Sequence, residues 1–212
     1  MTRGRFIAFE GGEGMGKSTQ ARLLADHLRQ SGKATELTRE PGGTPGAEAI
    51  RELLLSPPGD GWTLEAEALL FAAARADHVA RKIRPALEAG TWVVCDRYLD
   101  SSRAYQGIAG ALGDENVRAL HAVGSGGLLP DLTIVIDVPA SDVSARLAER
   151  DGDDSDAIGG RAADYHAAVN AAFLDFAKAE PERFAIVDGH GTIEEVHERV
   201  LAAVSPLMDE AG

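Results

Sequence analysis

The stretch RFIAFEGGEGMGKSTQ, residues 5–20, decides how the rest of this chain is interpreted. A short apolar run, 6–10, enters a glycine-rich loop, and the loop leads into a pattern with Leu23, Leu24 and Leu28 at helical spacing. Gly11, four residues, Gly16, Lys17 and Ser18 form the phosphate-binding loop pattern, in the strand, loop and helix context that this pattern requires. The sequence therefore predicts a nucleoside triphosphate site.

The chemistry explains these residue types. Glycines let successive backbone N–H groups curl around a phosphate, and the first turn of the following helix adds unpaired donors and the positive end of its dipole. We expect Lys17 to bridge the β- and γ-phosphates and Ser18 to bind the accompanying Mg²⁺. The predicted ATP-binding residues of the loop are Gly11, Gly12, Glu13, Gly14, Met15, Gly16, Lys17, Ser18 and Thr19.

Length and composition narrow the class of protein. A chain of 212 residues suits one α/β domain, 1–212. The formal charge of -13, from 21 Lys and Arg against 34 Asp and Glu, argues against nucleic acid as a partner. The only cysteine, Cys95, excludes an internal disulfide, and its apolar neighbours indicate a buried thiol. No apolar stretch resembles a signal peptide or a membrane span, so we expect a cytoplasmic protein without a membrane partner.

Apolar runs and helical patterns alternate along the chain, which predicts an α/β fold of three layers, a five-stranded parallel sheet flanked by helices. The expected strands are 6–10, 34–38, 91–96, 131–138 and 184–188. The expected helices follow residue 16 and span 47–55, 64–89, 99–127, 141–149, 162–179 and 192–207. We expect Pro85 to bend one helix, Gly107, Gly110 and Gly113 to break another, and Thr192 with Glu195 to form a capping box.

The acidic, glycine-rich segment 150–161, RDGDDSDAIGGR, has little to bury and is interpreted as a short mobile lid. Polar residues also follow the strands. Asp96 ends an apolar strand and is expected to complete the Mg²⁺ site with Ser18, and Arg97 is suited to binding a second phosphate. The alternative is an Asp and Arg pair that merely caps the strand.

A second phosphate site favours a kinase for phosphorylated acceptors over a hydrolase. A nucleoside monophosphate needs no strong general base, because its second pKa is about 6 and it is largely ionised at pH 7. Catalysis then consists of positioning and charge neutralisation. This agrees with six histidines that are scattered along the chain without metal-ligand spacing, for which surface or structural roles are expected.

The ordered motifs FEGGEGMGKST, TREPGGT, FAAARADH, DRYLDSSRAYQG, PDLTIVIDV and VDG make the chain resemble the bacterial thymidylate kinase family over nearly its whole length. The resemblance implies a P-loop NTPase fold and a Mg²⁺-dependent homodimer. It also implies transfer of the ATP γ-phosphate to dTMP, giving dTDP and ADP. The helix within 65–89 is the expected dimer contact, because its alanines allow close packing.

The resemblance also assigns roles to individual residues. It implies that Glu13 contacts the dTMP sugar, that Arg97 binds the acceptor phosphate and that Arg39 lies close to the transferred phosphate. Phe71 would stack on thymine, and Arg75 would hydrogen-bond the carbonyl edge of the base. On the sequence alone Phe71 also fits a core position.

Four further positions complete the acceptor site that the resemblance implies. Tyr105 and Gln106 would close over the sugar and base, with Tyr105 crowding a ribose 2′-OH. Ser101 would line the same pocket, and Pro41 would follow a cis peptide bond.

The lid departs from the family pattern. The loop has Gly14 where an arginine could stand, so the lid should supply an arginine for the transition state. However, residues 156–159 read Asp, Ala, Ile, Gly where Asp, Arg, Ile, Glu is common. The hypothesis is that Arg150 or Arg161 reaches the phosphates while Arg146 packs near the adenine. The alternative is that Arg150 and Arg161 are surface charges.

Two other functions remain open at this point. A kinase for another pyrimidine monophosphate, such as dUMP, would use the same fold and chemistry. A P-loop nucleotide switch would also bind a triphosphate, but the Asn, Lys, any residue, Asp motif that reads guanine is absent from the sequence.

Overall fold

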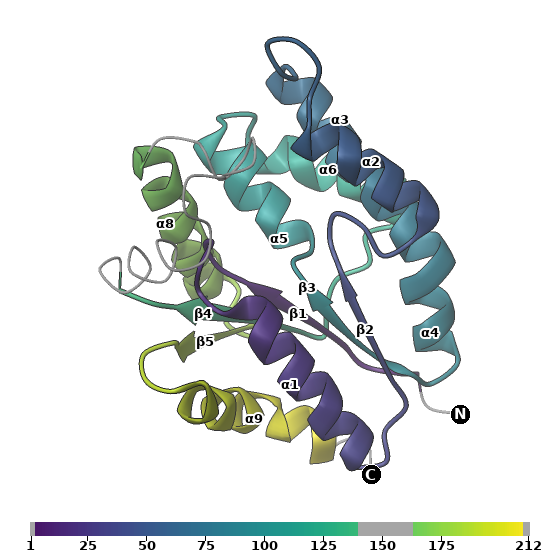
Figure 1. The fold of residues 1–212 in the computed structure, drawn as a ribbon, viewed down its shortest axis with the longest axis vertical. Helices are drawn as coiled ribbons and strands as arrows, with labels where there is room; N and C mark the ends of the chain where they lie inside the picture. The colour runs from purple at the N-terminus through teal and green to yellow at the C-terminus, as the bar shows by residue number, and fades with distance from the viewer. Residues whose placement is uncertain (1–2, 140–162, 210–212) are drawn as a thin grey trace.

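The computed structural model describes residues 3–139 and 163–209, whose path is drawn in Figure 1. The strands β1 (Phe6–Glu10), β2 (Thr35–Arg39), β3 (Trp92–Asp96), β4 (Leu132–Asp137) and β5 (Phe184–Asp188) form one sheet. The order is β2-β3-β1-β4-β5, and all neighbouring strands are parallel. The predicted parallel sheet is confirmed, and each strand lies within one residue of its predicted range.

Side chains of the central strand β1 alternate between two cores. Ile7 and Phe9 pack under α1 (Lys17–Gln30) and α9 (Ile193–Asp209), while Phe6 and Ala8 pack against the opposite face. All five residues of β1 are buried, as expected for a parallel strand covered on both faces. Figure 1 shows α1 and α9 on one side of the sheet and α5 (Leu99–Ser102), α6 (Asp114–Ser125) and α8 (Ala163–Ala179) on the other. The fold therefore has three layers.

Helix starts follow from local capping. The Thr44 hydroxyl accepts a hydrogen bond from Ala47 N at the start of α2 (Pro45–Leu55), and the Thr63 hydroxyl caps α3 (Leu64–His78) in the same way. At α9, Glu195 N donates to Thr192 Oγ1 over 3.2 Å and Thr192 N donates to Glu195 Oε2 over 2.8 Å. The predicted capping box is confirmed.

The predicted helical run 64–89 is continuous but not uniform. After α3 the chain passes through a π-helical segment, η1 (Val79–Ile83), before α4 (Arg84–Glu88). Proline has no N–H, and its ring clashes with the carbonyl four residues earlier in a regular helix. The wider π turn lies immediately before the helix that holds Pro85. The sequence pattern predicts the helical run but not this π segment.

The run 99–127 contains a second π-helical segment, η2 (Arg103–Ala109), directly after α5. The prediction that Gly107 breaks the helix is wrong, because Gly107 lies inside η2. A Cβ at that position would lie 3.4 Å from Val117 Cγ2 of α6, so the glycine permits close helix packing instead. The helical path is interrupted after η2, in the short segment that holds Gly110 and Gly113, before α6 begins.

Two predicted elements, the helix 141–149 and the lid 150–161, lie outside the described residues. Among the helices that the structure describes, none is long and apolar enough to cross a membrane. Cys95 is buried as a free thiol, as predicted.

Candidate active site

The glycine loop between β1 and α1 passes too close to the backbone of β4 for a side chain at Gly11. A Cβ on Gly11 would lie 2.7 Å from the Ile136 carbonyl oxygen, and Gly11 has a φ of 132°. Gly16, which directly precedes α1, has a φ of 88°, a left-handed conformation that glycine adopts without steric cost. The fold therefore favours glycine at Gly11 and Gly16.

Lys17 begins α1, is buried, and donates a hydrogen bond from Nζ to the Gly12 carbonyl oxygen. Burial lowers the pKa of Lys17 to about 7, and the charge of Arg97 acts in the same direction. An ammonium group with so little hydration is stabilised when a bound anion supplies counter-charge. The position of Lys17 in the loop therefore suits it to a polyphosphate.

The two predicted metal ligands are in contact, because Ser18 Oγ donates a hydrogen bond to Asp96 Oδ2. Asp96 Oδ1 is buried and has no hydrogen-bond partner among the described residues. Mg²⁺ prefers oxygen ligands and usually keeps several waters and substrate phosphate oxygens, so it needs few ligands from the protein. Within 3–139 and 163–209, no group of three or more His, Cys, Asp or Glu could hold a metal ion. Ser18 and Asp96 therefore fit a Mg²⁺ that binds together with the triphosphate.

An open cavity lies beside the loop. Every predicted acceptor-binding residue except Arg39 lines it, namely Glu13, Pro41, Phe71, Arg75, Arg97, Ser101, Tyr105 and Gln106. The fold thus brings together residues from the loop, the turn after β2, the turn after β3, and the helical segments α3, α5 and η2.

The cavity is also lined by five residues that the sequence did not predict to lie there: Glu40, Arg51, Leu55, Tyr98 and Ser102. Glu40 adjoins Pro41, and Tyr98 and Ser102 lie within the motif that contains Arg97 and Ser101, so nearness to predicted residues is a usable signal for these three. Arg51 and Leu55 are four residues apart on α2 and share a helix face. The sequence gives no indication that this face meets the cavity.

Arg97 lies at the loop end of the cavity and has a φ of 67°, which is uncommon for a residue with a side chain. Nη1 donates to the Gly11 carbonyl oxygen over 3.2 Å and to Ser101 Oγ over 3.1 Å. Nη2 donates to Tyr105 Oη over 3.4 Å, and the guanidinium carbon lies 5.2 Å from the centre of the Tyr105 ring. These partners orient Arg97 without contributing a negative charge.

Glu10 at the end of β1 fixes the turn that carries Arg97. It is fully buried and accepts hydrogen bonds from Tyr98 N over 2.8 Å, Ser101 N over 3.0 Å and Ser101 Oγ over 2.6 Å. Burial raises the pKa of Glu10 to about 7, and the charge of Asp100 adds to this effect. The available signal was a carboxylate at the end of an otherwise apolar strand.

Arg75 on α3 lines the same cavity and belongs to a buried network. Nε donates to Glu40 Oε2 over 2.7 Å, while Nη2 donates to the Tyr98 carbonyl oxygen over 3.1 Å and to Ser102 Oγ over 3.0 Å. Burial alone would raise the pKa of Glu40, but the charge of Arg75 and the hydrogen bond from His78 outweigh it and hold this pKa below its ordinary value. Arg75 and Glu40 therefore form a buried ion pair.

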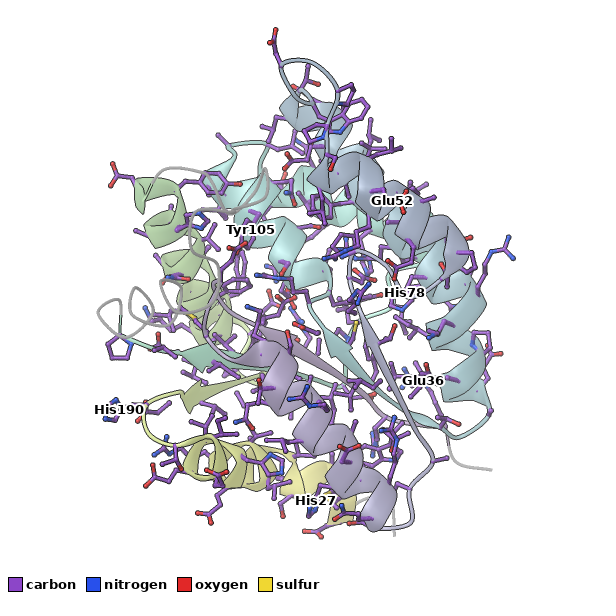
Figure 2. All side chains as sticks on the ribbon, viewed as in Figure 1. His27, Glu36, Glu52, His78, Tyr105 and His190 are labelled. Atoms are coloured by element: carbon purple, nitrogen blue, oxygen red, sulfur yellow. The ribbon has the colours of Figure 1, made fainter. Side chains whose placement is uncertain are left out.

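His78 supports this ion pair from behind. Nδ1 lies 3.0 Å from Glu40 Oε1 and Nε2 lies 2.7 Å from Thr38 Oγ1, both within hydrogen-bond distance. Figure 2 shows His78 inside the molecule, whereas His190 lies at its edge. His78 thus has a structural role, as expected for the histidines of this chain.

The remaining wall of the cavity comes from α3 and η2. Phe71 is half-buried and lies one helical turn before Arg75. The Gln106 amide donates from Nε2 to Glu67 Oε1 over 2.8 Å, and Tyr165 Oη donates to the Tyr105 carbonyl oxygen over 2.6 Å. Tyr105 is labelled in Figure 2 between η2 and α8. Glu67 and Tyr165 therefore hold the two residues expected to close over the sugar and base.

Arg39 lies in a different place from the other acceptor-binding residues. It is exposed, and Nη2 donates to Glu48 Oε2 over 3.1 Å. It lines a second hollow together with Ser18 and Asp96. Arg39 is thus near the two predicted metal ligands, and its contact with a phosphate stays a prediction. The peptide bond between Glu40 and Pro41 is cis, as the resemblance implied.

Arg146, Arg150, Arg161 and the segment 156–159 lie outside the described residues. The expected roles of the lid arginines therefore stay predictions.

Comparison with known proteins gives a consistent family. A model described as thymidylate kinase matches residues 9–200. The thymidylate kinase of Rhizorhabdus wittichii is 55% identical over 205 residues, which are 97% of this chain and 99% of that protein. The thymidylate kinase of Rhodopseudomonas palustris strain TIE-1 is 50% identical over 95% of this chain and 89% of its own length. That of Symbiobacterium thermophilum is 47% identical over 96% of this chain and 94% of its own length.

Proposed function

The chain belongs to the thymidylate kinase family, and from this premise we propose that it transfers the γ-phosphate of ATP to dTMP, giving dTDP and ADP. The main observation in favour of this proposal is that Arg97, beside the glycine loop, lines the same cavity as Phe71, Arg75 and Gln106. A phosphate binder and a set of base-binding groups in a single cavity match the two ends of a nucleoside monophosphate.

At the phosphate end, the backbone of the glycine loop and Lys17 bind the ATP phosphates, and Thr19 and Met15 complete this surface. Ser18 and Asp96 hold Mg²⁺, which when bound neutralises charge on the triphosphate. Arg97 holds the acceptor phosphate in line, and Arg39 binds the transferred phosphoryl group from the side of the metal ligands. No general base is required, because the acceptor phosphate is already ionised.

At the base end, Phe71 stacks on the pyrimidine, Arg75 donates to its carbonyl edge, and Gln106 closes the site. Tyr105 excludes a ribose 2′-OH, Glu13 contacts the sugar, and Ser101 and Pro41 line the same space. These assignments are supported by the shared lining of the cavity. They distinguish the proposal from a kinase for ribonucleotides, since a 2′-OH would meet Tyr105.

We propose that Arg150 or Arg161 neutralises the negative charge that develops on the transferred phosphoryl group in the transition state. Arg146 is proposed to contact the adenine. Arginines that act in this way contribute about 10³ to 10⁵ in rate. If Arg150→Ala and Arg161→Ala both keep near-normal turnover, this part of the proposal fails.

The test is a coupled ADP-release assay with Mg²⁺ and ATP, in which dTMP, dUMP, UMP, CMP, AMP and no acceptor are compared. We expect release that depends on dTMP and is much weaker with UMP. Equal release with every acceptor, or without one, would exclude the kinase and support a nucleotide switch. Preference for dUMP over dTMP would favour the other pyrimidine kinase.

We also propose a homodimer formed through α3, and a cytoplasmic location, where ATP is available. Exposed apolar side chains on α3 and on the adjacent α6, Leu69 at 55% and Val123 at 90% exposure, support the dimer. Sedimentation as a monomer at micromolar concentration would exclude the dimer, and recovery of the protein outside the cytoplasm on cell fractionation would exclude the location.

A further inference from the structure

Three arginines line the cavity, Arg51, Arg75 and Arg97. Arg51 donates a hydrogen bond to the Pro41 carbonyl oxygen over 2.9 Å, whereas Arg75 and Arg97 are the two arginines expected to contact the acceptor. A nucleoside monophosphate carries a phosphate dianion at one end and an uncharged base at the other. Two charged arginines in one cavity would both attract the phosphate, because a guanidinium binds phosphate oxygens strongly wherever it is partly desolvated. Productive binding therefore requires the two arginines to differ.

Arg75 differs from Arg97 because a carboxylate is bonded directly to it. The side chains of Arg75 and Glu40 are each only 4% exposed, and their N–O distance is 2.7 Å. In a low-dielectric interior, a pair at this distance presents almost no net charge to a ligand. Arg75 can then offer hydrogen-bond donors to an uncharged group without attracting an anion.

The guanidinium of Arg75 is also fixed in orientation. Of its five N–H groups, the Nε hydrogen goes to Glu40. The Nη2 hydrogens go to the Tyr98 carbonyl oxygen and to Ser102 Oγ. In the part of the chain that the structure describes, only the Nη1 hydrogens lack a hydrogen-bond partner. Arg75 therefore has one pair of donors left for a ligand.

Arg97 has the opposite character. Its hydrogen bonds within the described residues go to the Gly11 carbonyl oxygen, Ser101 Oγ and Tyr105 Oη, which are all uncharged acceptors. The nearby Glu10 is bonded to Tyr98 N and to Ser101 instead. Arg97 thus keeps its positive charge for an incoming anion.

We propose that Glu40 is a specificity-determining positioning residue that sets the direction in which a nucleotide lies in the cavity. By cancelling the charge of Arg75, Glu40 makes Arg97 a stronger anion site than Arg75, so the phosphate binds beside the glycine loop and the base binds at Arg75. His78 holds the other carboxylate oxygen of Glu40, Oε1, in place and is itself hydrogen-bonded to Thr38. This inference rests on the proposed function, since it concerns the same cavity and the same acceptor.

The experiment uses sulfate as an anion probe against dTMP, at saturating Mg²⁺ and ATP and at constant ionic strength. In the wild type, one sulfate ion competes with dTMP. The slope of a plot of reciprocal rate against reciprocal dTMP concentration therefore rises linearly with sulfate concentration. In Glu40→Gln, the unpaired Arg75 forms a second anion site. The slope then rises with the square of sulfate concentration, and the KM for dTMP increases by about tenfold.

Two further variants locate the second anion. Glu40→Gln combined with Arg75→Gln removes both charges, and linear inhibition by sulfate is expected to return. Glu65→Gln makes the same change of net charge at an exposed position on the helix of Arg75, so it is the matched control and should behave as the wild type. A second anion site that persists in the double variant would overturn the inference.

The wild type tests the inference even if Glu40→Gln does not fold. Inhibition of the wild type that already depends on the square of sulfate concentration would show two anion sites and overturn it. Linear inhibition in Glu40→Gln, with an unchanged KM, would also overturn it. Wild-type protein that does not phosphorylate dTMP at all would contradict the proposed function instead, so the two failures are distinguishable.

Discussion

The loop end and the base end of the cavity are both built from residues far apart in the sequence, but in different ways. Ser18 and Asp96 meet because β1 and β3 are neighbouring parallel strands, in which Phe9 pairs with Asp96. Arg75 and Glu40 meet through side chains on a helix and a turn that are 35 residues apart, and Gln106 and Glu67 meet across 39 residues. Strand pairing thus brings Ser18 and Asp96 together, whereas buried carboxylates hold Arg75 and Gln106.

This difference predicts that a substitution at the loop end removes chemistry without removing structure. Lys17→Ala should lower kcat/KM by about 10³-fold, because the loop loses its only cation for the phosphates. The free energy of unfolding of the ligand-free protein should not fall, because a buried ammonium is costly. Steady-state kinetics and urea denaturation measure the two effects.

The matched control is Lys178→Ala, which removes an exposed ammonium from α8. It should leave both quantities unchanged. A Lys17→Ala enzyme with nearly normal kcat/KM would show that the loop end is not the site of phosphate binding.

Glu10 accepts hydrogen bonds from the turn that carries both Arg97 and Tyr98, so it connects the two ends of the cavity. The pH dependence of the free energy of unfolding tests this role. The pKa of Glu10 is raised from 4.5 to about 7 in the folded protein. As the pH rises, the unfolded state therefore loses the Glu10 proton at a lower pH than the folded state does. The resulting stabilisation is fully present below pH 4.5 and is lost as the pH rises through about 7.

The full effect is about 3 kcal/mol, since one unit of pKa corresponds to about 1.4 kcal/mol. Glu10→Gln has no carboxyl to titrate, so its free energy of unfolding relative to the wild type should increase between pH 5 and pH 8. Urea denaturation at both pH values measures this change. Glu52→Gln, at an exposed position on α2, should follow the wild type, and equal pH dependence in all three proteins would contradict the prediction.

The smallest expected effect concerns the base end. Glu67→Ala leaves the buried Gln106 amide without its acceptor, and an unsatisfied buried donor costs about 1 to 3 kcal/mol. The free energy of unfolding should fall by this amount and the KM for dTMP should rise, while kcat changes little. Glu65→Ala, two residues earlier and exposed, is the control, and equal stability of the two variants would mean that Glu67 does not hold Gln106.

The same contrast explains what the sequence could predict. The alternation of strand-like and helical patterns located all five strands, and the glycine pattern located Lys17 and Ser18. Parallel topology then placed Asp96 and Arg97 beside them. Resemblance to a family was needed for Phe71, whose residue type fits a core position equally well.

Features that depend on side chains meeting between helices were not predicted. Glu67 is a buried carboxylate, and nothing in its local sequence distinguishes it from a surface charge. For Glu10 and Glu40, the local sequence indicates a place near the site but not the hydrogen-bond partners. The π-helical segments η1 and η2 were missed for a related reason. A helical pattern of apolar residues shows that a helix forms, but it does not show where one extra residue is accommodated in a turn.

Cys95 has a practical consequence for studying the lid. Its thiol is fully buried, donates a hydrogen bond to the Arg97 carbonyl oxygen, and has a pKa raised well above the ordinary value, chiefly by burial. Such a thiol reacts poorly with alkylating reagents, because the thiolate is the reactive form. Since the chain has no other cysteine, a cysteine introduced within 150–161, the predicted lid, would be the intended labelling site. A fluorophore there could report lid closure on nucleotide binding without any change to the native thiol.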